Sequence, residues 1–240
     1  MATTLLYIPS DEIIRFVSDN PIDWSDPDLA KRNGPGDRAG VTPTPAVEEF
    51  LNLLLVERQL FTQQRYADWC LTAWREWWIG KPNPQIRGVR AKLYRNFYPS
   101  MIDSLHVWAM LSESGRFDSC ALDSADDAIG KTDLTVTAGE SVFRLALLGP
   151  TEKAMQDRQY KIKHRSAGET ACIEIALPRA YPRNPGNKRW FKAPEVLNAI
   201  MQGGYLPPPK RHMPAPGGNG QLSLFCGTQG GHNYGSTNQR

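Results

Sequence analysis

The sequence predicts an α/β (α+β) protein in which a helical N-terminal half leads into a small mixed sheet flanked by helices. Apolar residues recur at helical spacing between residues 46 and 111, which predicts helices there. Short β-rich runs separated by turn residues follow between residues 118 and 178, which predicts strands. Beyond them, residues 204–240 are dominated by Pro, Gly, Asn and Gln, and we expect a disordered tail.

Composition limits the possible classes of protein. The 240 residues are 40% hydrophobic and 22% charged, which is typical of a globular chain with room for one substantial domain and extensions or for two small domains. The net charge of +3 says little about partners. Four scattered cysteines without a CxxC pair favour reduced thiols in a cytoplasmic protein. The N-terminus does not resemble a signal peptide, and no run approaches the roughly 18 apolar residues of a membrane span, so we expect no membrane partner.

Four regions follow from the pattern along the chain. Residues 1–45 form an N-terminal arm that ends in a stretch rich in Pro, Gly and Asp. Residues 46–99 form a helical region, in which "AVEEFLNLLLVERQLFTQQ" and "RYADWCLTAWREWWIG" predict two helices, the second ending at Gly80 before "KPNP". Residues 100–203 form an α/β core with a basic loop, and residues 204–240 form the tail.

Two features of the helical region have a structural and a functional interpretation. The tryptophans of the second helix favour helix packing over an aromatic binding platform. The segment "KPNPQIRGVRAKLYRNFYP" carries five basic residues and no acid. A solvated basic face explains it at least as well as a surface that contacts phosphates.

The α/β core is predicted element by element. "SMIDSLHVWAMLSESG" gives a third helix that ends at Gly115, and "DSCALD" gives a short strand. "KTDLTVTAGESVFRLALLG" gives a hairpin around Ala138, Gly139 and Glu140. "TEKAMQDRQYKIKHR" predicts a helix, "TACIEIALP" a further strand, and "APEVLNAIMQGG" a last short helix.

The core from about residue 100 to residue 178 resembles the PD-(D/E)XK nuclease superfamily, whose core is a helix, a three-strand meander, a helix and a further strand. That resemblance implies a catalytic acid at Asp133, an acid on the preceding helix at Asp103 or Glu113, and Mg²⁺ held by the carboxylates. The third strand departs from the family pattern, because Arg144, Leu145 and Ala146 stand where an acid and a lysine are expected. Glu174 on the next strand is followed by Ala176 at the lysine position.

These departures predict a degenerate site that needs no cofactor. In an alternative, the site has migrated, and Asp133, Asp103 or Glu113, and Glu174 hold Mg²⁺ with Lys161 or Lys163 as the basic residue. In a second alternative, Asp133 has no catalytic role, and its side chain only forms hydrogen bonds within a turn or at a cap.

A basic and aromatic loop follows the last strand. Lysine and arginine can neutralise phosphates, while Tyr181 and Trp190 can stack on bases. The predicted DNA-binding residues are Arg179, Arg183, Lys188, Arg189, Trp190 and Lys192. A solvated loop whose aromatic residues dock on the domain explains the same composition.

The most specific motif is "QLSLF" in the tail, formed by Gln221, Leu222, Ser223, Leu224 and Phe225. It resembles the pentapeptide by which bacterial replication and repair proteins bind the β sliding clamp, and all five positions agree. A chance pentapeptide or a short strand folded back on the domain is the alternative.

The sequence therefore predicts a cytoplasmic, DNA-associated accessory protein of replication, repair or a mobile element, recruited to the sliding clamp and non-catalytic. Its expected partners are the β clamp, DNA, and other replication or transposition proteins. Two alternatives stay open at this stage: an active Mg²⁺-dependent DNA endonuclease, and a protein-binding adaptor that makes no DNA contact.

Overall fold

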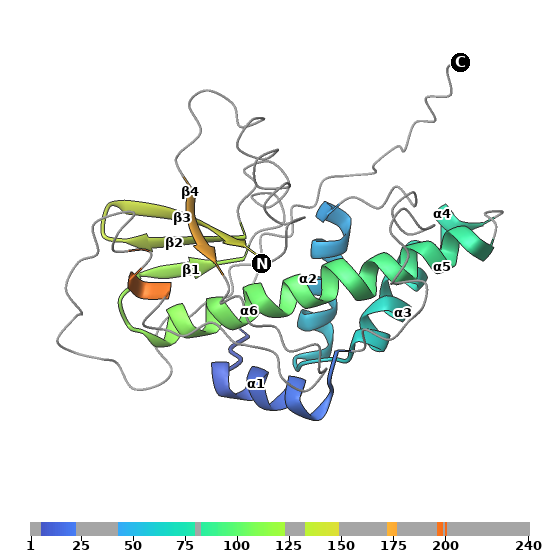
Figure 1. Cartoon of the computed structure of the whole chain (residues 1–240), viewed down its shortest axis with the longest axis horizontal. Helices are drawn as coiled ribbons and strands as arrows, with labels where there is room; N and C mark the ends of the chain where they lie inside the picture. Colours follow the sequence, from blue (N-terminus) through green and yellow to red (C-terminus); the bar gives the residue numbers. More distant parts are fainter. Residues whose placement is uncertain are drawn as a thin grey trace, which may run out of the picture.

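A long helical rod runs through the part of the chain that the computed structural model describes, which is residues 6–22, 43–79, 83–122, 133–148, 172–176, 196–198 and 200 (Figure 1). The rod consists of α5 (Asn83–Lys92), a π-helical turn η1 (Leu93–Phe97) and α6 (Tyr98–Glu113), which follow one another without a gap. Gly115 adopts the left-handed conformation that commonly follows a helix end, at φ 63°, so the predicted end of the third helix is confirmed.

The structure describes four further helices, three of which pack on the rod. α1 (Ser10–Asp19) contacts α6 and buries Ile13 and Val17, although the sequence analysis assigned this segment to an arm without predicting a helix. α2 (Pro43–Glu57) packs on α3 (Gln63–Ala73) and on α6, and the short helix α4 (Arg75–Trp78) follows α3.

The prediction of one helix through residue 64 is wrong at its end. The chain turns at Arg58, which has a positive φ of 55°. The side chain of Thr62 then caps α3 by accepting a hydrogen bond from the Arg65 N–H at 3.2 Å. Leu60 and Phe61, which supplied the apolar pattern, are buried in the connection between the two helices rather than on a helix face.

The predicted strands form one small mixed sheet in the order β1-β2-β3-β4. β1 (Ser119–Ala121), β2 (Leu134–Ala138) and β3 (Ser141–Leu148) form an antiparallel meander, and β4 (Cys172–Ala176) joins parallel to β3. The predicted hairpin turn is confirmed, with Gly139 at φ 60°. In β2, buried Leu134, Val136 and Ala138 alternate with half-buried threonines, so one face of the sheet belongs to the core.

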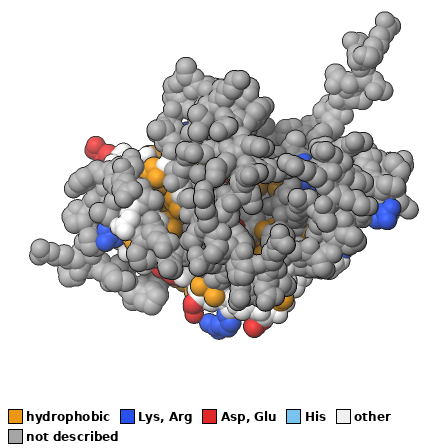
Figure 2. Space-filling view, in the orientation of Figure 1, with side chains coloured by type: hydrophobic (Ala, Val, Ile, Leu, Met, Phe, Trp, Pro, Cys, Tyr) orange, Lys and Arg blue, Asp and Glu red, His pale blue; other side chains and the backbone are white. Residues whose placement is uncertain are grey.

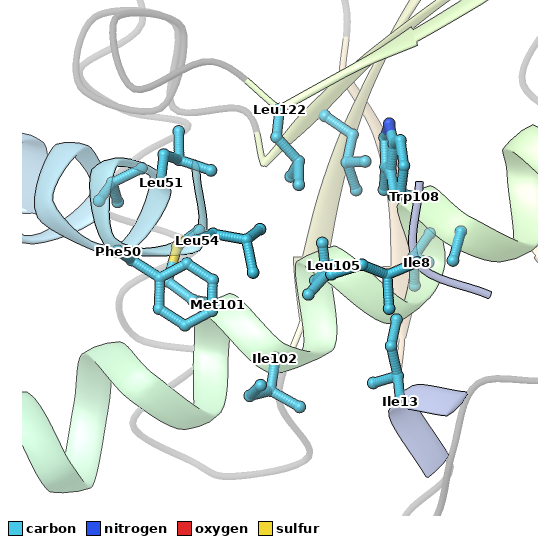
Figure 3. Packing of buried hydrophobic residues seen from close by; sticks show 14 of the residues in the cluster. Ile8, Ile13, Phe50, Leu51, Leu54, Met101, Ile102, Leu105, Trp108 and Leu122 are labelled. Carbon is cyan, nitrogen blue, oxygen red and sulfur yellow. The ribbon is translucent and has the colours of Figure 1, made fainter. Parts of the chain in front are cut away.

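Helices and sheet share one hydrophobic core (Figure 3). In Figure 3, Leu54 of α2, Leu105 of α6 and Leu122, which follows β1, lie around a common apolar region. The fully buried indole of Trp108 joins α6 to the sheet, because its Nε1 donates to the carbonyl of Cys120 at 2.9 Å.

A buried aromatic cluster fixes the helices at the N-terminal end of α6. It is formed by Phe50, Phe61, Tyr66 and Tyr98, with the rings of Phe50 and Phe61 4.8 Å apart in an edge-to-face arrangement. The Tyr66 hydroxyl donates to the carbonyl of Ala46 and the Tyr98 hydroxyl to that of Phe61, each at 2.7 Å. Both buried hydroxyls therefore have acceptors, as burial of a polar group requires.

The described residues thus show a mixed α+β fold of helices around a small sheet. The predicted boundary between residues 99 and 100 falls inside α6, which belongs to the core common to helices and sheet. Within the last predicted helix, residues 196–198 and 200 are helical, and Val196 and Ile200 are buried in the same core. None of the described helices is long and apolar enough to span a bilayer.

Candidate functional site

Asp133, the predicted strand-two acid, lies directly before β2 and is hydrogen-bonded to β3. Its N–H donates to the carbonyl of Leu145 at 2.8 Å, and its carboxylate Oδ2 accepts from the N–H of Leu147 at 2.6 Å. The second bond is partly buried and joins a charged acceptor to a backbone donor, a combination stronger than a neutral hydrogen bond. Asp133 therefore stabilises the end of the β2–β3 ladder.

The third strand brings no carboxylate to Asp133. Arg144 pairs with Thr135 and Leu145 with Leu134, while Ala146 pairs with Glu174 of β4. Leu145 is fully buried and Ala146 almost so. The register places the backbone of Glu174 next to Ala146, two strands from β2, and the Glu174 side chain lies outside the described residues.

Glu113, one of the two predicted helix acids, holds α1. Its carboxylate accepts from the N–H of Ser10 at 2.7 Å, from the Ser10 hydroxyl at 2.6 Å and from the Tyr7 hydroxyl at 3.2 Å. Since α1 begins after Pro9 and has no side-chain cap of its own, Glu113 acts as its N-terminal cap from another helix. Burial, together with Glu113, raises the pKa of Tyr7.

Asp103, the other predicted helix acid, lies in the first half of α6 between buried neighbours. It is partly exposed, whereas Ile102 and Ser104 on either side are buried. His106, one turn further along α6, is almost fully buried. Among the described residues, no group of three or more His, Cys, Asp or Glu side chains could hold a metal ion.

The two described thiols lie in the interior of the protein. Cys70 and Cys120 are buried and free. Burial raises the pKa of both thiols, which makes the nucleophilic thiolate scarce at neutral pH.

The tryptophans and basic residues of the helical region also make structural contacts. Trp69 packs on the core and donates from Nε1 to Glu49 of α2 at 2.7 Å, which supports helix packing for this member of the cluster. Arg90 of α5 forms an ion pair with Asp68 of α3 at 2.7 Å, and the Lys92 ammonium lies 5.9 Å from the centre of the Phe97 ring.

A polar network between α3 and the rod was missed by the sequence analysis. The Tyr94 hydroxyl donates to the side chain of Gln64, Gln64 donates to Asp68 at 2.7 Å, and the Arg90 guanidinium lies 5.8 Å from the centre of the Tyr94 ring. The four-residue spacing of Gln64 and Asp68, and of Arg90 and Tyr94, was the available signal.

The remaining predicted site residues lie outside the described residues. They are the DNA-binding Arg179, Arg183, Lys188, Arg189, Trp190 and Lys192, the clamp-binding Gln221, Leu222, Ser223, Leu224 and Phe225, and the alternative basic residues Lys161 and Lys163.

Comparisons of this chain with protein-family models, with curated proteins and with solved structures find no match.

Proposed function

We propose that this protein is a non-catalytic accessory protein of DNA replication, repair or a mobile element, recruited to the bacterial β sliding clamp. The observation that carries the proposal is the pentapeptide Gln221–Phe225, which agrees with the clamp-binding pattern at all five positions. Gln221 can hydrogen-bond at the rim of a pocket, and Leu222, Leu224 and Phe225 can fill apolar pockets.

The position of the motif relative to the folded body suits a tether. Ile200 is fully buried in the core, and Gln221 follows 21 residues later. A chain of this length reaches at most about 75 Å when fully extended. Binding of the pentapeptide to a clamp would raise the local concentration of the folded body at the DNA that the clamp encloses.

DNA is the second proposed partner, and we propose that the protein acts in the cytoplasm. The segment 179–192 has five basic residues and no acid, and its lysines and arginines can displace counterions from phosphates. Tyr181 and Trp190 can stack on exposed bases in the same segment.

We further propose that the core is nuclease-like with a degenerate site. The resemblance implies a helix, a three-strand meander, a helix and a further strand. Of these, the described residues include α6, the meander β1–β2–β3 and β4, while residues 149–171, where the second helix is expected, lie outside them. Two of the candidate carboxylates form hydrogen bonds that stabilise the fold. Asp133 accepts a hydrogen bond from the Leu147 N–H, and Glu113 accepts one from the Ser10 N–H. Metal ligation by either group would have to compete with these bonds.

A clamp-binding titration tests the tether. We expect the full chain to bind purified β clamp with micromolar affinity, and the Leu224→Ala, Phe225→Ala variant to bind at least about tenfold more weakly, because two pocket-filling side chains are removed. The matched control is Asn233→Ala, Tyr234→Ala, which truncates two tail residues outside the motif and should bind as the unmodified chain does. Equal binding by all three proteins, or none by the unmodified chain, would overturn the tether.

Two further measurements separate the alternatives. Incubation with Mg²⁺ or Mn²⁺ and several forms of DNA should leave the DNA intact, whereas cleavage that disappears in Asp133→Ala would establish the nuclease. Charge reversal of Arg179, Arg183, Lys188 and Arg189 should weaken DNA retention. Unchanged retention would favour the adaptor without DNA contact.

A further inference from the structure

The antiparallel pair formed by α3 and the rod accumulates positive charge toward one end. Residues 69–102 contain six basic residues and one acid, Glu76, which gives this stretch a net charge of +5. Figure 2 shows Lys and Arg side chains at the end of the molecule where Figure 1 draws α4 and α5. Such an excess of positive charge on neighbouring helices is stabilised either by acidic residues of the protein itself or by a bound anion.

Internal contacts account for two of these charges. Arg90 is neutralised by Asp68 at 2.7 Å and lies over the Tyr94 ring. Lys92 lies over the ring of Phe97. The Arg90 side chain therefore joins α5 to α3, and the Lys92 side chain covers an aromatic ring of η1.

Arg75 and Arg87 are different. Both are exposed, and neither has an ion pair or hydrogen bond with any other residue in the described part of the chain. Their guanidinium groups are the two described charges of this stretch that have no ion pair, hydrogen bond or ring contact with another described residue.

The register of α3 on the rod places both arginines toward the same end of the pair. Gln64 bonds with Tyr94 and Asp68 with Arg90, so four residues forward in α3 correspond to four residues backward in the rod. The same register sets Thr72 beside the turn that contains Arg87. Arg75 begins α4 three residues later, after α3 ends at Ala73 and the chain passes through Trp74.

We propose that Arg75 and Arg87 form a contact surface for the phosphates of duplex DNA. This surface is separate from the basic segment 179–192, and its assignment to DNA rests on the proposed function. Arginine suits the role because its planar guanidinium binds phosphate oxygens in a bidentate manner and stays charged at any physiological pH. Contacts of this kind position a protein on the duplex without reading its sequence.

The test is the salt dependence of DNA binding by the full chain. The probe is a duplex of about 40 bp of arbitrary sequence. We expect Arg75→Gln, Arg87→Gln to bind about ten- to a hundredfold more weakly near 0.1 M salt, and the slope of log K against log salt to become shallower by about 2, since each phosphate contact contributes about 0.9. A second duplex of unrelated sequence should show the same loss.

The matched control is Arg15→Gln, Arg58→Gln, which removes the same charge at two exposed arginines of α1 and of the α2–α3 connection. An unchanged slope in the Arg75, Arg87 variant, an equal loss in the control, or no DNA binding by the unmodified chain would overturn the inference. The clamp titration reports on the tether independently. Lost clamp binding with a retained arginine effect would overturn the proposed recruitment and leave this surface in place.

Discussion

At the scale of single residues, the acids of this chain hold elements together. Glu113 caps α1 from α6, Asp133 binds the N–H of Leu147, and Glu49 accepts from the indole of Trp69. Each carboxylate joins segments that are distant in sequence or lie on different elements. The resemblance could propose Asp133 and Glu113 as metal ligands, because the sequence shows the residue types without the backbone donors that approach them.

Glu49 gives a prediction about pH. It is half-buried, and burial raises its pKa above the ordinary value of 4.5, although hydrogen bonds from Trp69 and Asn52 oppose the shift. The folded state therefore binds more protons than the unfolded state just above pH 4.5. The contribution of Glu49 to stability is fully present below this pH and is lost as the pH rises through the folded pKa.

We expect Glu49→Gln to remove this loss, because the neutral amide can still accept from the Trp69 indole. The free energy of unfolding, measured by urea denaturation between about pH 4 and pH 7, should decline less with rising pH in the variant. Glu12→Gln is the matched control, since Glu12 is exposed on α1 and is not among the groups that shift the pKa of Glu49. A decline as steep in Glu49→Gln as in the unmodified protein would contradict the prediction.

At the scale of elements, the sequence predicted strands more completely than helices. β1, β2, β3 and β4 lie within the runs that predicted them, because alternation and a glycine turn are local signals. The break at Arg58, the helix α1 and the turn η1 were missed. α1 and η1 depend on contacts with residues distant in the sequence, Glu113 at α1 and Gln63 at η1. At the break, Leu60 and Phe61 extend the apolar pattern of the helix but are buried in the connection before the Thr62 cap.

In the candidate site, too, local features could be predicted from the sequence and features that depend on distant contacts could not. The lack of a carboxylate on the third strand could be read from "SVFRLALLG" alone, and the register then fixed Arg144 beside Thr135 and Ala146 beside Glu174. The pairing of Asp133 with the Leu147 N–H could not be read, because it depends on where the two strands of the hairpin end relative to each other.

The π-helical turn gives a prediction about Gln63. This side chain is almost fully buried at the start of α3, and its Nε2 donates to the carbonyl of Tyr94 within η1 at 3.0 Å. A π-turn interrupts the regular helical bonding, so its carbonyls are open to side-chain donors. We expect Gln63→Leu to lower the free energy of unfolding by about 1–3 kcal/mol, because a buried carbonyl loses a donor. Urea denaturation measures this loss.

Gln64→Leu is the matched control for Gln63. Gln64 is exposed, so water can replace the bonds that it makes to Tyr94 and Asp68. Its replacement should change stability by no more than about 0.5 kcal/mol. Equal losses in the two variants would show that Gln63 has no special role at η1.

At the scale of the whole molecule, the shared core makes helices and sheet one cooperative unit. The rod runs from the helical region into the α/β core, α1 and α2 pack on α6, and Trp108 bonds α6 to β1. Neither the helical region nor the sheet buries its apolar face without the other. The described fold should therefore unfold in one step.

Leu105 provides the test, because it is fully buried on α6 between the residues of α2 and those that follow β1 (Figure 3). Leu105→Ala should lower the free energy of unfolding by about 2–5 kcal/mol through lost apolar contacts and the cavity that remains. Amide hydrogen exchange should then show the same loss of protection in α2 as in the β2–β3 hairpin, since both open only by global unfolding. Val56→Ala, at a side chain that is 63% exposed on α2, is the control and should leave both unchanged. Protection lost in the hairpin but kept in α2 would mean that the two halves fold separately, in which case the region that carries Arg75 and Arg87 could be tested for DNA binding as a fragment of its own.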